Sequence, residues 1–182
     1  MRVYERAVFP GRFQPPHLGH LYALRWSLNL AEEIVVVVGS AEKSHTLTNP
    51  MTAGERILAL RESIKEEGLP LERFIIIPVP DIQYNSLWVS YLETLIPRFH
   101  CAISGNPLVK RLFSEKGYPV HEPPFYMREQ MSGVRIRKMM IEGGKWDDLV
   151  PRAVARIIRE AGIIERMKQL LSTDEPPTSK IF

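Results

Sequence analysis

Short apolar blocks alternate with longer amphipathic stretches along most of this chain. The blocks at residues 3–9, 34–38, 74–79, 101–104 and 118–121 predict five strands. The block at 34–38 reads Ile-Val-Val-Val-Val and is apolar at every position, which is typical of a parallel strand buried on both faces. The pattern therefore favours one parallel sheet.

Between these blocks, apolar residues recur at helical spacing. Thr52 and Glu55 have the spacing of a capping box, and Asn106 followed by Pro107 is a typical helix start. The predicted helices cover residues 18–33, 52–67, 86–96 and 106–117, and a helical segment follows over residues 132–171.

Strands that alternate with helices predict an α/β fold. We expect a single Rossmann-like domain over residues 1–171, with an open parallel five-stranded sheet, helices on both faces and a C-terminal helical segment. Residues 172–182 are mostly polar, and we expect them to form a disordered tail. Ligands of such sheets bind at the carboxyl ends of the strands, near the switch in strand order.

Composition narrows the class of protein. The 182 residues carry a net charge of +3, with lysine and arginine scattered among acids, so we expect no nucleic-acid partner. No apolar run approaches the ~20 residues needed to span a bilayer, and the charged start of the chain is unlike a secretory signal. The single cysteine, Cys101, cannot form an internal disulfide. These features predict a cytoplasmic protein without a membrane partner.

Residues 11–20 (GRFQPPHLGH) follow the first predicted strand and open the first predicted helix. The first N–H groups of a helix lack partners, and the helix dipole favours negative charge there. His17 and His20 would lie beside these groups, and Arg12 adds a planar cation suited to phosphate. Gly11 would allow the backbone to come close to a ligand. The stretch therefore predicts an anion site.

These ten residues resemble the (His/Thr)-x-Gly-His motif of the nucleotidyltransferase superfamily, in the form found in the archaeal type of nicotinamide mononucleotide adenylyltransferases. A second stretch, residues 132–137 (SGVRIR), is similar to the superfamily's Ser-x-Thr-x-Ile-Arg motif, which holds the ATP triphosphate. Val134 stands where the family usually has threonine, so one hydroxyl is missing. The resemblance extends over about residues 5–171.

The residues themselves favour chemistry between phosphates, since two anion sites occur without a convincing Ser-His-Asp or paired-carboxylate arrangement. A phosphomonoester acceptor is mostly dianionic near pH 7, with a second pKa of about 6, so no general base is needed. The reaction needs alignment and charge neutralisation at the α-phosphorus. We expect Mg²⁺ to enter with ATP and to need few protein ligands, because it keeps its waters. The catalytic residues are predicted to be Arg12, His17, His20 and Arg137.

The resemblance also implies the substrate contacts. Near Asp81, the family has a segment in which an aromatic side chain stacks on the nicotinamide ring, and Trp88 takes that place here. Trp88 could instead be a core residue of an amphipathic helix, and His45 could be an ordinary loop residue. The nicotinamide mononucleotide contacts are predicted to be Ser40, His45, Asp81, Asn85 and Trp88. The ATP contacts are predicted to be Gly11, Phe13, Gly19, Gly105, Asn106, Ser132, Gly133, Val134 and Arg135.

The resemblance implies adenylyl transfer from ATP to nicotinamide mononucleotide, giving NAD and pyrophosphate, and a homo-oligomeric enzyme. Two alternatives remain open at this stage. The acceptor could be nicotinate mononucleotide or phosphopantetheine, although a flexible phosphopantetheine chain gives Trp88 no obvious role. The chain could also be a non-catalytic nucleotide-binding regulator, and the intact histidine motif argues against that.

Overall fold

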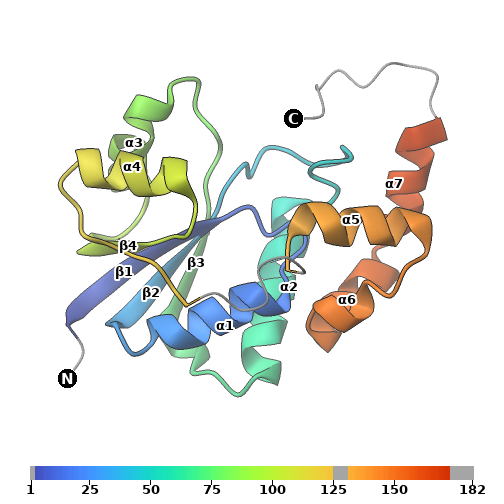
Figure 1. The fold of residues 1–182 in the computed structure, drawn as a ribbon, viewed down its shortest axis with the longest axis horizontal. Coiled ribbons are helices and arrows are strands. Elements are labelled where there is room, and N and C mark those ends of the chain that lie inside the picture. The colour runs from blue at the N-terminus through green and yellow to red at the C-terminus, as the bar shows by residue number, and fades with distance from the viewer. Residues whose placement is uncertain (1–2, 125–130, 173–182) are drawn as a thin grey trace.

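A parallel sheet forms the centre of the molecule in the computed structural model, which describes residues 3–124 and 131–172 (Figure 1). Within these residues the sheet has five strands in the order β3-β2-β1-β4-β5, and every neighbouring pair is parallel. The predicted α/β fold with one open five-stranded sheet is confirmed. The strands are β1 (Tyr4–Gly11), β2 (Ala31–Val38), β3 (Phe74–Pro78), β4 (Cys101–Ile103) and β5 (Val120–His121).

Helices cover both faces of this sheet. In Figure 1, α3 and α4 lie over one face, α1 and α2 lie on the other, and α5, α6 and α7 gather beyond α2. Over the described residues the helices are α1 (Leu18–Ser27), α2 (Ala53–Glu66), α3 (Trp88–Leu95), α4 (Pro107–Glu115), α5 (Gly133–Glu142), α6 (Arg152–Glu160) and α7 (Ile163–Ser172).

Successive residues of the central strands enter two different cores. Phe9 of β1 and Val36 of β2 pack with side chains of α1 and α2. Val8 and Val35 point to the opposite face and pack with side chains of α3 and α4. This burial on both sides explains why the block at 34–38 is apolar at every position. A third cluster joins α2 to the C-terminal helices.

The clearest difference from the predicted elements is the end of α1. The apolar spacing predicted a helix to about residue 33, but α1 ends at Ser27 and the chain enters β2 at Ala31. The Leu30 N–H donates to the Ser27 carbonyl at this turn, and Ala31 then pairs with Tyr4 of β1. Pairing within a buried sheet outweighs a helical pattern of only a few residues.

The C-terminal helical segment consists of three α-helices, interrupted at Gly143 and Gly162. Ser172, where the predicted tail begins, is the last residue of α7, and residues 173–182 lie outside the described part of the chain. Among the described residues, no helix combines the length and the apolar character that crossing a membrane requires.

Candidate active site

The histidine motif lies at the carboxyl end of β1, beside the switch point where the strand order reverses between β1 and β4. His17 is the N-cap residue of α1, and its backbone N–H donates to Nδ1 of His20 over 3.1 Å. The two imidazole rings are stacked, with centroids 3.6 Å apart. Because Nδ1 of His20 accepts a hydrogen bond, a neutral His20 carries its proton on Nε2. That N–H is a fixed donor for a ligand.

Burial controls the charge of both rings. His17 is 8% exposed, and its Nδ1 has no hydrogen-bond partner within the described residues. Desolvation lowers the pKa of His17 to about 4. Burial, reinforced by the charge of His17, holds the pKa of His20 well below its ordinary value. Both side chains are therefore neutral hydrogen-bonding groups at pH 7, and His17 retains an unused polar atom.

This burial predicts a specific loss of stability in acid. A histidine whose pKa is depressed in the folded state stabilises the fold above its unfolded pKa, and that contribution disappears as the pH falls toward the folded pKa. Between pH 6.5 and 4, His17 alone should lower the free energy of unfolding by about 3 kcal/mol. Urea titrations at a series of pH values measure this loss. His17→Asn should show a smaller decrease over the same window; an identical decrease in both proteins would contradict the assignment.

Two glycines of the motif make room for neighbouring rings. A Cβ atom on Gly19 would lie 3.1 Å from Nδ1 of His17, and one on Gly11 would lie 2.7 Å from the Phe13 ring. The space that a Gly11 side chain would occupy is taken by the Phe13 ring, while the Gly11 backbone lines a cavity, so its predicted close approach to a ligand stays a prediction. Phe13 itself is 1% exposed and packs against His20, with ring centroids 4.7 Å apart. The buried Phe13 side chain therefore helps to hold the His20 ring in place.

The second motif folds against the first. Ser132 caps α5 by accepting a hydrogen bond from the Arg135 N–H, and Arg137 turns inward to become 7% exposed. Nη1 of Arg137 donates to the Gln14 carbonyl over 2.6 Å. Burial, followed by the nearby charge of Arg12, lowers the pKa of Arg137 to about 10. Arg137 is therefore a buried guanidinium that stays charged at neutral pH beside the histidine loop.

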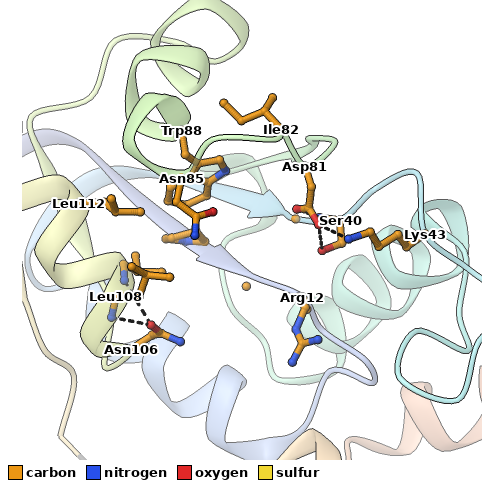
Figure 2. Close-up of a pocket in the computed structure, with 14 residues that line it drawn as sticks. Arg12, Ser40, Lys43, Asp81, Ile82, Asn85, Trp88, Asn106, Leu108 and Leu112 are labelled. Atoms are coloured by element: carbon orange, nitrogen blue, oxygen red, sulfur yellow. Dashed lines mark hydrogen bonds and ion pairs between the residues drawn. The ribbon is translucent and has the colours of Figure 1, made fainter. Parts of the chain in front are cut away.

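Two cavities open side by side at this edge of the sheet and share Pro10 and Asn106. The smaller one has a volume of about 250 Å³, and its lining includes five of the predicted residues: His17, Gly19, His20, Gly105 and Asn106. The larger one has a volume of about 560 Å³ (Figure 2), and its lining includes Gly11, Arg12, Ser40, Asp81, Asn85, Trp88 and Asn106. His17 and His20 thus line one cavity, and four of the five predicted acceptor contacts line the adjoining one.

Several predicted residues line neither cavity. Val134 is 66% exposed on the outer side of α5, so its methyl groups face solvent in the position of the usual threonine. His45 is exposed, and its Nδ1 lies 2.9 Å from the Ser44 hydroxyl. The predicted residues outside both linings are Phe13, His45, Ser132, Gly133, Val134, Arg135 and Arg137.

Asp81 in the larger cavity already has partners. Its carboxylate accepts hydrogen bonds from the Ser40 hydroxyl at 2.8 Å and from Nζ of Lys43 at 2.7 Å (Figure 2). Burial opposes ionisation of this carboxyl, but the bonds from Lys43 and Ser40 outweigh it and hold its pKa below the ordinary value. Sequence reasoning missed Lys43, although its place three residues after Ser40 in the same loop was a usable signal.

The Trp88 side chain contacts both the hydrophobic core and the larger cavity. One side of its indole meets Phe113 edge-on, with ring centroids 5.7 Å apart, and it packs against the core on the α3 and α4 face. The same side chain lines the larger cavity, where Figure 2 shows it beside Asn85 and opposite Leu108 and Leu112 of α4. The two interpretations of Trp88 from sequence are therefore compatible.

Two buried side chains that sequence reasoning missed tie the loops of the site together. The Gln14 amide exchanges two hydrogen bonds with the Met51 backbone, at 2.8 and 3.0 Å. Arg56 of α2 donates to backbone carbonyls of the segments that follow β1 and β2. Gln14 lies inside the histidine motif but has no role implied by it, and Arg56 belongs to no local motif; the partners of both side chains are distant in sequence.

Comparison with known proteins agrees with this geometry. A family model described as cytidylyltransferase-like matches residues 8–142. Over 170 residues the chain is 55% identical to a nicotinamide-nucleotide adenylyltransferase of Ignicoccus hospitalis, an alignment that covers 93% of this chain and 99% of that protein. The chain belongs to the nicotinamide-nucleotide adenylyltransferase family. Another family member, from Saccharolobus solfataricus, is 44% identical over 170 residues, with coverage of 93% and 99%.

The fold is also that of more distant solved structures. A bifunctional NMN adenylyltransferase/ADP ribose pyrophosphatase of Francisella tularensis, complexed with AMP and manganese, aligns with a TM-score of 0.64 at 18% identity. The alignment covers 96% of this chain and 58% of that protein, so this chain spans little more than half of it. Nucleotidyltransferases of this kind generally use a divalent metal with ATP. In residues 3–124 and 131–172, no group of three His, Cys, Asp or Glu side chains is placed to hold a metal ion.

Proposed function

We propose that this protein transfers the adenylyl group of ATP to nicotinamide mononucleotide and releases pyrophosphate, a step of NAD biosynthesis. One observation carries the proposal. The histidine-lined cavity and the Trp88-lined cavity adjoin at the switch point and share Pro10 and Asn106. A nucleotide in the first and a phosphorylated acceptor in the second would bring two phosphates to their common border.

The chemistry at that border is an attack by one phosphate on another. An oxygen of the acceptor phosphate forms a bond to the α-phosphorus of ATP, and the bond to the β-phosphate oxygen breaks, so that its electron pair leaves with pyrophosphate. The acceptor is already dianionic, since its second pKa is about 6, and no base is needed. The protein must align two anions and offset the charge that develops between them.

Three side chains are suited to that task. His20 offers its Nε2–H, because Nδ1 is held by the backbone. Arg137 is held by the Gln14 carbonyl, and Arg12 lies in the lining of the acceptor cavity while its charge acts on Arg137. This set of cations and N–H donors fits phosphate oxygens rather than a bare cation. We therefore expect Mg²⁺ to arrive on the β- and γ-phosphates of ATP, where it neutralises the leaving group.

Trp88 is proposed as the platform for the pyridinium ring of the acceptor. Stacking a cationic ring on indole is worth about 0.5–2 kcal/mol. An isolated Asp81 carboxylate would repel the carboxylate of nicotinate, but here Lys43 and Ser40 bond to it and partly offset its charge. This paired carboxylate should discriminate less between nicotinamide and nicotinate mononucleotides than an isolated carboxylate would.

The test is pyrophosphate release with Mg-ATP and nicotinamide mononucleotide, nicotinate mononucleotide or phosphopantetheine as the acceptor. We expect turnover with the nicotinamide substrate and NAD as the product. Turnover with phosphopantetheine alone would preserve the chemistry and overturn the acceptor assignment. Measurable ATP binding without turnover on any acceptor would instead support a nucleotide-binding regulator.

Replacing Trp88 by leucine should raise the KM for nicotinamide mononucleotide by about 2–30-fold, the equivalent of the stacking energy, and leave the KM for ATP unchanged. Steady-state kinetics with each substrate varied in turn measure both constants. Phe99→Leu is the control, because Phe99 belongs to the same aromatic cluster but lines neither cavity. It should lower stability without changing either KM. An unchanged acceptor KM in Trp88→Leu would show that the indole serves the core alone.

A further inference from the structure

Arg56 is a fully buried cation in the second turn of α2, with 0% of its surface exposed. Among the residues that the structure describes, its guanidinium donates to four backbone carbonyls and to no carboxylate. Nη1 donates to Arg12 at 2.9 Å and to Gly39 at 2.7 Å, Nη2 donates to Ser40 at 3.1 Å, and Nε donates to Thr52 at 3.2 Å. Burying a charge is costly unless its hydrogen bonds compensate, and this one uses carbonyls alone.

Three of these carbonyls belong to the loops that build the acceptor cavity. β1 and β2 remain paired up to Gly11 and Val38, and the Gly39 N–H still donates to the Gly11 carbonyl. Beyond that point the two strands end, and the chain continues into the segments that carry Arg12 and Ser40. Arg56 links these two segments, because its one guanidinium bonds to the Arg12 carbonyl and to the Gly39 and Ser40 carbonyls, just beyond the last hydrogen bond between the strands.

The side chains of these two segments have different proposed roles. Arg12 is one of the cations placed to offset charge during transfer, while Ser40 donates to Asp81 in the lining of the same cavity (Figure 2). If the acceptor binds in this cavity as proposed, the distance between Arg12 and Ser40 sets where it lies relative to the reacting phosphates. The histidine-lined cavity, in contrast, shares no lining residue with the carbonyls that Arg56 holds.

We infer that Arg56 is a positioning residue that sets the separation between Arg12 and the Ser40–Asp81 pair, and so aligns the acceptor for attack. The inference rests on the proposed function. Arginine suits the task because its planar fork presents donors in fixed directions, whereas a lysine ammonium on a flexible stem cannot hold three carbonyls in the same geometry.

The chain contains a matched control at the opposite end of β2. Arg73 donates to the carbonyls of Glu32, Leu28 and Ala31, at 2.6, 3.0 and 2.7 Å, where β2 begins. Like Arg56 it donates to several backbone carbonyls, but all of them belong to the one connection from α1 into β2, and Arg73 lines neither cavity. Arg73→Lys therefore shows how the loss of a multiple carbonyl contact affects the kinetics when that contact lies away from both cavities.

The experiment compares Arg56→Lys and Arg73→Lys with the wild type, using kcat, the two KM values and thermal unfolding. Both variants should unfold at lower temperature. Arg56→Lys alone should raise the acceptor KM and lower kcat/KM for the acceptor by about 10²-fold, the usual effect of a misplacement near 1 Å, while the KM for ATP stays unchanged. Arg73→Lys should keep all three kinetic constants.

Other results would overturn the inference. Equal kinetic losses in both variants, or unchanged acceptor kinetics in Arg56→Lys, would leave Arg56 with a structural role only. If Arg56→Lys does not fold, Arg56→Gln takes its place with the same expected pattern; if neither folds, Arg56 is a folding requirement and the inference fails. A wild-type protein without turnover on nicotinamide mononucleotide would refute the proposed function itself, before any variant is compared.

Discussion

Replacing His20 by alanine is expected to lower kcat for adenylyl transfer by about 10²–10³-fold, the typical effect of removing one preorganised donor from a transition state. The reason lies in the N-cap of α1. The His17 N–H holds Nδ1 of His20, so Nε2–H is fixed in one direction before any ligand binds. A donor aimed at developing charge contributes mainly in the transition state, so the affinity for ATP should change little. Single-turnover kinetics and ATP titration calorimetry measure the two quantities.

The matched control for this variant is His121→Ala. His121 lies on β5, contacts the Tyr4 hydroxyl at 3.1 Å and lines neither cavity. It should preserve kcat. If His20→Ala lost ATP affinity in proportion to its loss of kcat, His20 would be a ground-state binding residue and the proposed role would be wrong.

The second large effect is expected from Arg137→Lys, which should lower kcat/KM for ATP by about 10²-fold. Nη1 of Arg137 is committed to the Gln14 carbonyl, so the planar fork can direct its other N–H groups toward the phosphates. Lysine keeps the charge, but its ammonium lacks the planar arrangement that lets one side chain bond to the Gln14 carbonyl and to a phosphate at the same time. Steady-state kinetics with ATP varied at saturating acceptor measure this loss.

Lys138→Ala provides the comparison for Arg137→Lys, since Lys138 is the next residue of α5 and lies on its exposed side, 3.8 Å from Glu142. It should retain wild-type kinetics. Full activity in Arg137→Lys would mean that charge alone matters at this position. The geometric argument for the guanidinium would then be refuted.

The sequence determined the main elements because they depend on local signals. The apolar blocks correspond to the five strands. Thr52 and Asn106 are the N-cap residues of two helices that begin where predicted. The end of α1 could not be read in the same way. Residues 28–33 continue a helical pattern, and only pairing with β1 places Ala31 at the start of a strand.

The histidine motif could also be identified from the sequence, because its residues are consecutive and lie at the start of one helix. The residues that hold the loops of the site in place could not be predicted in this way. Arg56 meets the Arg12 carbonyl across 44 positions, and Lys43 meets Asp81 across 38. The place of Lys43 in the Ser40 loop was a usable local signal, but no local pattern names Asp81 as its partner, and nothing near Arg56 in the sequence distinguishes it from an exposed arginine of an amphipathic helix.

The sequence by itself thus determined the fold class, the family and the place of the two motifs that we propose bind phosphate, since each depends on neighbouring residues. Only the tertiary structure decided that Gly11 makes room for Phe13, that Asp81 is paired with Lys43, and that the two cavities adjoin at Asn106. The physical reason is the same in each case. Burial, pairing and shared space arise where segments that are distant along the chain meet, and the parallel sheet brings their ends to one edge.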